Sequence, residues 1–102
     1  MEGRSNVWYL TGRISQNDSI QDIEIDTTPF RIGRRHDLSL TLPYAAVSNL
    51  HAEVVVEASS CSIRDLNSTN GTFVNGIRVT QETPLQAGDI IRFADVAFRI
   101  QQ

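Results

Sequence analysis

Residues 72–79 read TFVNGIRV, and this short stretch decides the fold class. The dipeptide Asn75-Gly76 separates two runs of β-branched and apolar residues. A two-residue Asn-Gly loop favours a type I′ turn, because both of its residues accept positive φ and the turn matches the twist of the flanking strands. The stretch therefore predicts a β-hairpin.

The same alternation of short strands and turn residues extends outward along the chain. Helical periodicity is hard to find, whereas runs rich in β-branched and aromatic residues recur between turn clusters. In Phe30-Arg31-Ile32, for example, the apolar side chains fall on one face and the charged side chain on the other. Many short strands separated by turn residues predict a sandwich or barrel. The predicted strands are residues 8–14, 21–25, 30–33, 39–42, 52–57, 62–66, 72–74, 78–79, 90–93 and 97–100.

Size and composition limit the possible functions. A chain of 102 residues fits one domain, predicted to span residues 1–102 with its core at about 7–101. Nine basic and twelve acidic residues give a net charge of −3, which opposes non-specific binding to nucleic acid or an anionic membrane. The single Cys61 excludes an intrachain disulfide, and we find no secretion signal, so a cytoplasmic location is expected.

Polar groups are concentrated in three loops. Residues 31–36, RIGRRH, form the one basic run, in which Arg34 follows a glycine that lets a ligand approach the backbone. Residues 47–53, VSNLHAE, offer Ser48 and Asn49 before a strand, and Pro43 predicts that residues 44–49 are loop. Residues 64–76, RDLNSTNGTFVNG, contain more small polar residues than a turn requires, including Ser68, Thr69 and Asn70.

These loops are expected to gather, because the loops at one end of a sandwich meet although they are distant in sequence. Arg34 would then supply a guanidinium able to hold a phosphate through two parallel hydrogen bonds. Hydroxyls and amides from the other two loops would complete the set. This chemistry suits a tetrahedral dianion carried by a peptide. The alternative for each residue taken singly is an ordinary turn or a solvated strand end.

The motifs resemble those of the forkhead-associated (FHA) domain family, a phosphothreonine-peptide-binding module. The family pattern appears as Gly33-Arg34, Ser48-Asn49-Leu50-His51 and residues 70–76, NGTFVNG, in the same order and spacing. The resemblance extends to the closing residues 85–93, LQAGDIIRF. It implies an all-β fold, an eleven-strand FHA/SMAD-like β-sandwich with its binding loops at one end.

The resemblance also implies roles for individual residues. Arg34, Ser48 and Thr69 are expected to bind the phosphate. Asn49, Asn70 and Ser68 are expected to bind the peptide, the two asparagines through its main chain. Gly33, His51 and Gly71 are expected to brace the site. The chain departs from the family at Asn67, where relatives most often carry glycine, and asparagine is the substitute that best tolerates positive φ.

The expected function is recognition of a phosphothreonine-bearing signalling partner by a monomeric module, free-standing or within a larger signalling protein. No cofactor is expected. The main alternative is a phosphate-independent assembly module that uses a sheet face or edge strand. An enzyme would have to combine Ser48, His51 and Asp65, and no nucleophile-elbow motif supports this. The residues His36, His51 and Cys61 lack zinc-site spacing, so no metal is expected, and no broad basic surface indicates nucleic acid.

Overall fold

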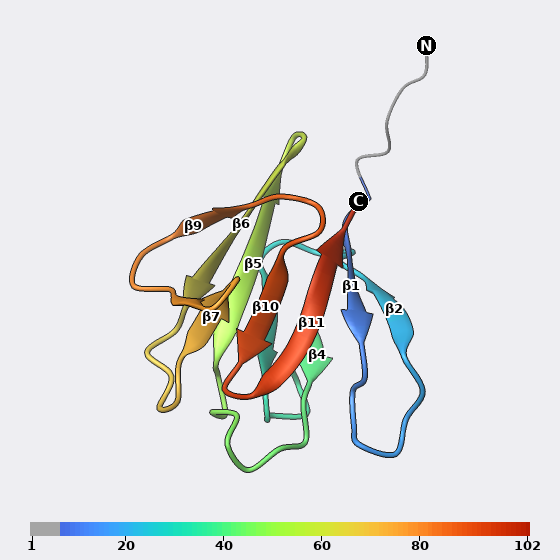
Figure 1. Cartoon of the computed structure of the whole chain (residues 1–102), viewed down its shortest axis with the longest axis vertical. Helices are drawn as coiled ribbons and strands as arrows, with labels where there is room; N and C mark the ends of the chain where they lie inside the picture. The colour runs from blue at the N-terminus through green and yellow to red at the C-terminus, as the bar shows by residue number, and fades with distance from the viewer. Residues whose placement is uncertain (1–6) are drawn as a thin grey trace.

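The predicted strands form a two-layer β-sandwich in the computed structural model, which describes residues 7–102 (Figure 1). The eleven strands of this part of the chain are β1 (Tyr9–Gly12), β2 (Gln21–Glu24), β3 (Phe30–Gly33), β4 (Leu40–Thr41), β5 (Ala52–Glu57), β6 (Ser60–Asp65), β7 (Thr72–Val74), β8 (Ile77–Arg78), β9 (Thr83–Leu85), β10 (Ile90–Phe93) and β11 (Val96–Gln101). The predicted eleven-strand sandwich is confirmed.

The strands divide into a six-stranded sheet, ordered β2-β1-β11-β10-β7-β8, and a five-stranded sheet, ordered β4-β3-β5-β6-β9. All pairs are antiparallel except β3 with β4. Alternation along each strand sends one set of side chains between the sheets, as in β11, where Val96, Phe98 and Ile100 are buried and Ala97 and Arg99 are exposed. The core between the sheets includes fully buried Phe30, Phe93, Phe98, Leu10 and Ile63.

One strand escaped sequence analysis. Strand β9 contains Pro84, which lacks a backbone N–H and cannot donate a hydrogen bond to a neighbouring strand. The strand lies at the edge of the five-stranded sheet and pairs only with β6, Pro84 standing opposite Ser62. An edge strand needs donors on one side only, so proline is tolerated there. The other strands differ from prediction only at their ends.

The turn predictions agree with the backbone. Asn75 and Gly76 have φ of 51° and 83°, as a type I′ turn between β7 and β8 requires. Residues 44–49 form loop rather than strand, as Pro43 indicated. Within residues 7–102, no helix of the length and apolarity needed to cross a membrane is found.

Candidate functional site

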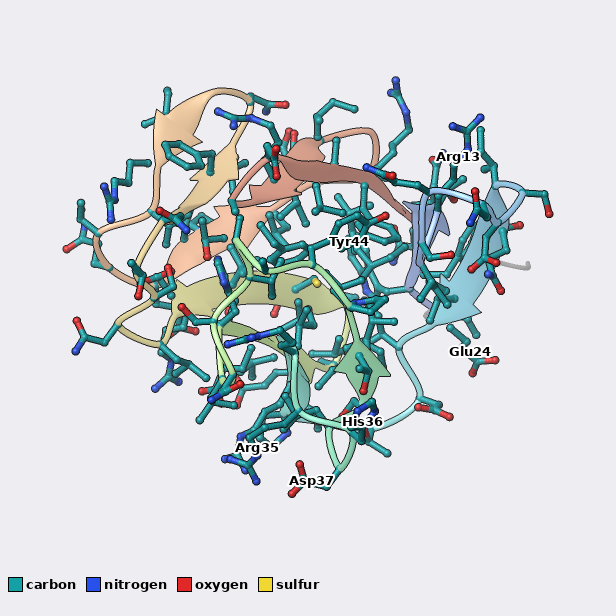
Figure 2. The ribbon with its side chains drawn as sticks, turned by 90° about the horizontal axis from the view of Figure 1, so that it is seen from below. Arg13, Glu24, Arg35, His36, Asp37 and Tyr44 are labelled. Carbon is teal, nitrogen blue, oxygen red and sulfur yellow. The ribbon has the colours of Figure 1, made fainter. Side chains whose placement is uncertain are left out.

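Three loops meet at one end of the sandwich, the lower end in Figure 1. They are the β3–β4 loop, the β4–β5 loop and the β6–β7 loop. Figure 2 looks onto this end, with Arg35, His36 and Asp37 of the β3–β4 loop on one side and Tyr44 of the β4–β5 loop near the centre. The sheet order explains the meeting, because β3, β5 and β6 are neighbours in one sheet and β7 leads into the other.

Backbone hydrogen bonds fix the first two loops together. The Arg34 N–H donates to the Ser48 carbonyl at 3.0 Å, and the Arg35 N–H donates to the Asn49 carbonyl at 3.3 Å. This contact demands glycine at position 33, where an added Cβ would lie 2.3 Å from the Asn49 carbonyl oxygen. The predicted backbone requirement at Gly33 therefore has a direct steric cause.

Side chains join the second loop to the third. The Ser48 Oγ accepts a hydrogen bond from the Thr69 N–H at 2.9 Å. The Asn70 Nδ2 donates to the Ala46 carbonyl at 2.8 Å. Residues from all three predicted loops are thus brought together, as sequence analysis expected.

His51 lies beneath these loops and is fully buried. Its Nδ1 accepts a hydrogen bond from the Ser48 N–H at 3.0 Å, which leaves Nε2 as the protonated nitrogen, facing the Gly71 carbonyl at 2.9 Å. The ring also packs edge-on against Phe93, with 6.0 Å between centroids. One side chain therefore connects the β4–β5 loop, the β6–β7 loop and the core, which agrees with the predicted bracing role.

Asp65 organises the β6–β7 loop. Its carboxylate accepts hydrogen bonds from the Ser68 N–H at 3.0 Å, the Ser68 hydroxyl at 2.6 Å and the Thr72 hydroxyl at 2.7 Å. Burial by itself raises the pKa of the Asp65 carboxyl, but the hydrogen bonds from Ser68 and Thr72 outweigh it and hold the pKa below its ordinary value. The network therefore favours the ionised carboxylate.

This role of Asp65 was not predicted from the sequence, where the residue was a candidate only for a catalytic triad. A signal was present, since aspartate three residues before a serine commonly closes a local side-chain-to-backbone turn. Asn67, within the same turn, has φ of 61°, a conformation that asparagine tolerates, so it can stand where the family resemblance implied glycine. The loop conformation therefore tolerates the departure from the family pattern.

Ser68 was predicted to contact the peptide, and its position does not fit that role. The residue is buried, with a relative exposure of 8%. Its hydroxyl donates a hydrogen bond to Asp65 and accepts one from the Gly71 N–H at 2.9 Å. The hydroxyl is therefore engaged both as a donor and as an acceptor inside the loop. The placement makes Ser68 a brace of the loop, together with Gly71, whose φ is 91°.

Five of the six predicted binding residues present free polar groups. Arg34 is exposed, and among residues 7–102 its side chain has no ion-pair or hydrogen-bond partner. The Ser48 Oγ is engaged only as an acceptor, so its proton remains available to donate. Thr69 and Asn49 are exposed, and the Thr69 hydroxyl and the Asn49 amide are available to a ligand. The Asn70 side-chain carbonyl is available as an acceptor. The loop end therefore offers a cation and hydroxyl and amide groups to a ligand.

The same contacts separate the residues of the alternative triad. His51 uses both ring nitrogens on backbone groups, and neither contacts the Ser48 hydroxyl. Asp65 binds Ser68 and Thr72 instead of orienting the imidazole. Within the described residues, no group of three or more His, Cys, Asp or Glu side chains is placed to hold a metal ion.

A β-sandwich with this loop end defines a class of ligand-binding module, and comparison with known proteins identifies the family. The FHA domain model matches residues 30–94, nearly two-thirds of the chain, and the chain belongs to the FHA domain family. Members of this family are non-catalytic phosphothreonine-binding modules.

Curated relatives include the transcriptional regulatory protein EmbR of Mycobacterium tuberculosis, 41% identical over 71 residues, which are 70% of this chain and 18% of EmbR. The FHA domain-containing protein FhaA of the same organism is 46% identical over 61 residues, 60% of this chain and 11% of FhaA. The chain therefore spans only a small part of these relatives.

Solved structures agree with the fold. M. tuberculosis EmbR in complex with a low-affinity phosphopeptide has a TM-score of 0.84 and 35% identity, covering 93% of this chain and 24% of that one. A structure described as an analysis of phosphothreonine-dependent FHA domain interactions has a TM-score of 0.82 and 31% identity, covering 94% and 96%.

Proposed function

We propose that this chain recognises phosphothreonine peptides at the loop end, with Arg34, Ser48 and Thr69 holding the phosphate. The observation that carries the proposal is the Arg34 guanidinium, which has no partner among residues 7–102 and lies beside the other two residues. The Arg34 N–H donates a hydrogen bond to the Ser48 carbonyl, and the Ser48 Oγ accepts one from the Thr69 N–H. Phosphothreonine carries about −1.5 to −2 charges near neutrality and three acceptor oxygens, which match a guanidinium and two hydroxyl donors.

Asn49 and Asn70 would hold the peptide main chain. The Asn70 Nδ2 is committed to the Ala46 carbonyl, so the amide plane is fixed and its oxygen is oriented to accept a peptide N–H. Asn49 is exposed and follows Ser48 directly, where its amide can donate and accept. Preorganised groups lower the entropic cost of ordering a flexible ligand.

The wider setting belongs to the same proposal. The module would act as one domain with its core at about residues 7–101, as a monomer in the cytoplasm, binding a phosphorylated signalling protein. The relatives support a place within a larger protein, because the matched region is 18% of EmbR and 11% of FhaA. Solved FHA complexes include one with a phosphopeptide, which supports the ligand class.

The test compares Arg34→Ala with Arg35→Ala by calorimetric titration of a phosphothreonine peptide and its unphosphorylated form. Arg35 is the matched control, because it is adjacent and cationic but pairs with Asp37 in solvent. Losing one partner of a desolvated charge pair costs about 2–5 kcal/mol, so Arg34→Ala should weaken binding on the order of a hundredfold or more. Arg35→Ala should retain most of the affinity.

Two results would refute the assignment. One is full affinity in a correctly folded Arg34→Ala protein. The other is equal binding of the unphosphorylated peptide, or of a Thr→Glu peptide, since a single planar carboxylate cannot use all the donors offered. Equal binding of the unphosphorylated peptide would favour the phosphate-independent assembly module instead.

A further inference from the structure

Five arginines lack a carboxylate partner among residues 7–102. In this part of the chain the ion pairs involve only Arg31, Arg35 and Arg64. Of the unpaired arginines, Arg34 belongs to the proposed phosphate site. The other four all lie on or beside the six-stranded sheet: Arg13, Arg78, Arg92 and Arg99.

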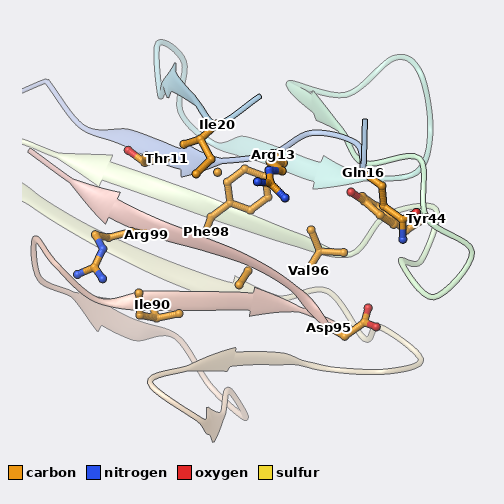
Figure 3. A pocket seen from close by; sticks show the side chains of 12 residues that line it. Thr11, Arg13, Gln16, Ile20, Tyr44, Ile90, Asp95, Val96, Phe98 and Arg99 are labelled. Atoms are coloured by element: carbon orange, nitrogen blue, oxygen red, sulfur yellow. The ribbon is translucent and has the colours of Figure 1, made fainter. Parts of the chain in front are cut away.

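Strand register places the side chains of Arg78, Arg92 and Arg99 on the outer face of the sheet. Arg78 on β8 stands opposite Phe73 on β7, which stands opposite Arg92 on β10. Arg99 shares the outward face of β11 with Ala97, the partner of Arg92. Arg13 follows the end of β1, and Figure 3 shows it and Arg99 beside the same groove. We call Arg13, Arg78, Arg92 and Arg99 the arginine face.

Neutral groups hold the guanidiniums in position. The Arg92 guanidinium lies 4.4 Å from the centroid of the Phe73 ring and that of Arg78 lies 5.9 Å from it. Arg92 Nη1 donates to the Ala94 carbonyl at 3.0 Å, and Arg99 Nη1 donates to the Gly88 carbonyl at 3.2 Å. A guanidinium has five N–H donors, so each of these arginines keeps most of its donors for a ligand. Their charge is not neutralised by the fold.

The outer face of the five-stranded sheet is different. There Arg31 Nε and Arg64 Nε lie 3.1 and 3.5 Å from the Glu53 carboxylate, and Arg64 Nη2 lies 3.6 Å from Glu82. Carboxylates near the arginine face have no ion-pair partner within residues 7–102: Asp22 accepts from the Thr11 hydroxyl, Asp89 accepts from Asn75, and exposed Asp95 lines one edge of the groove. In a chain of net charge −3, four of the five unpaired arginines among these residues nevertheless lie on one sheet face.

The arginine face begins beside the proposed phosphate site. The Arg78 guanidinium carbon lies 3.1 Å from the position of a Cβ on Gly71, the residue that follows Asn70. Arg92 is also linked to Gly71, through Ala94. The Ala94 carbonyl accepts a hydrogen bond from Arg92, and the Ala94 N–H donates one to the Gly71 carbonyl at 2.9 Å. A ligand leaving Asn70 across Gly71 therefore meets Arg78 and Arg92 first.

The far side of the arginine face is hollowed. A groove of about 590 Å³ lies between Arg13 and Arg99, with Ile20, Ile90 and Phe98 among its lining (Figure 3). Ile20 is 62% exposed at this groove. Four strand spacings separate β8 from β1, about 19 Å at roughly 4.8 Å each, which about six extended residues would cross. The surface thus has the length and shape to take a short peptide segment.

We propose that the arginine face binds a segment rich in aspartate and glutamate in the same partner chain as the phosphothreonine. This proposal rests on the proposed function, because the phosphate site anchors the partner and the arginine face adds a second contact to one flank. An acidic segment fits because its negative charges complement the unpaired arginines. It can belong to the same partner chain because the arginine face begins next to the loop end. An intramolecular second contact also benefits from high effective concentration, so weak ion pairs suffice.

The test titrates wild type with three phosphothreonine peptides that differ only in one six-residue flank: acidic on the amino side, acidic on the carboxyl side, or neutral. One acidic peptide should bind about three- to tenfold more tightly than the neutral peptide at low salt, and the advantage should shrink as salt rises. The double variant Arg78→Gln/Arg99→Gln should bind the neutral peptide normally and lose most of the advantage. Arg64→Gln is the charge-matched control on the opposite sheet and should keep it.

The outcomes separate the two proposals. Equal affinity of all three phosphopeptides for wild type would overturn the acidic contact and leave the phosphate site standing, as would an advantage that persists in Arg78→Gln/Arg99→Gln. Failure of every phosphopeptide would overturn the proposed function and with it this inference. If duplex DNA or anionic vesicles displaced the acidic flank at equal charge concentration, general polyanion binding would replace the acidic-segment assignment. Thermal melting of each variant confirms that the fold is intact.

Discussion

Replacing Asp65 with asparagine should loosen the β6–β7 loop and weaken phosphopeptide binding without removing any group that contacts the ligand. The Asp65 carboxylate accepts hydrogen bonds from the Ser68 N–H, the Ser68 hydroxyl and the Thr72 hydroxyl. An asparagine side chain replaces one acceptor oxygen with an NH2 group, which would face a donor. At least one of the three hydrogen bonds must therefore be lost or rearranged.

The size of the effect follows from that count. A hydrogen bond to a charged group contributes about 1.5–3 kcal/mol, and the lower part of this range applies because Asp65 is only partly buried. The Asp65→Asn change should lower the free energy of unfolding by about 2 kcal/mol. For a domain of this size that is roughly 8–16 °C in Tm.

The pH dependence of unfolding should change as well. The folded-state pKa of Asp65 lies below its ordinary value. Its contribution is therefore fully present above the unfolded-state pKa of about 3.9, and it is lost as pH falls through the lower folded-state pKa. Wild type should lose more stability than Asp65→Asn on going from pH 6 to pH 3.

Denaturant unfolding from pH 3 to pH 7, combined with titration of the phosphothreonine peptide at pH 7, measures all three effects. Asp89→Asn is the matched control, since Asp89 also accepts hydrogen bonds from a side chain and a backbone N–H, but these bonds are exposed whereas those of Asp65 are partly buried. It should change stability by less than about 1 kcal/mol and leave affinity unchanged. Equal stability and affinity of Asp65→Asn and wild type would refute the bracing role of the carboxylate.

Three further outcomes are expected. His51→Ala should lower stability by about 2–4 kcal/mol and affinity together, because it removes a buried ring and two hydrogen bonds; lost affinity at unchanged Tm would indicate direct ligand contact instead. Gly33→Ala should cost about 1–3 kcal/mol and weaken binding, because its Cβ would meet the Asn49 carbonyl at 2.3 Å and push apart the loops of Arg34 and Ser48; a fully stable variant with wild-type affinity would contradict this. Phosphothreonine should be preferred over phosphoserine by about 1–3 kcal/mol if the loops enclose its γ-methyl, which a matched peptide pair measures, and equal affinities would remove the methyl pocket.

Local chemistry alone determined much of the fold. Strand periodicity, the Asn75-Gly76 turn and Pro43 act through the backbone preferences of a few neighbouring residues, so they are readable from sequence. The strand at Pro84 could not be read from the sequence in this way. A strand tolerates proline when it lies at a sheet edge, and edge position is set by the order of the strands in space.

The site can be divided in the same way into features that the sequence determines and features that only the fold decides. The sequence determined which polar groups the loops carry and, through the family pattern, that Arg34, Ser48, Thr69, Asn49 and Asn70 are the binding candidates. Which hydroxyl faces inward was decided only by tertiary structure: Ser68 and Thr69 are adjacent and alike, yet Ser68 turns to Asp65 while Thr69 stays exposed. The arginine face shows this most plainly, because residues 13, 78, 92 and 99 share no sequence pattern. Sheet pairing places them together, and long-range contacts of this kind depend on the whole chain having folded.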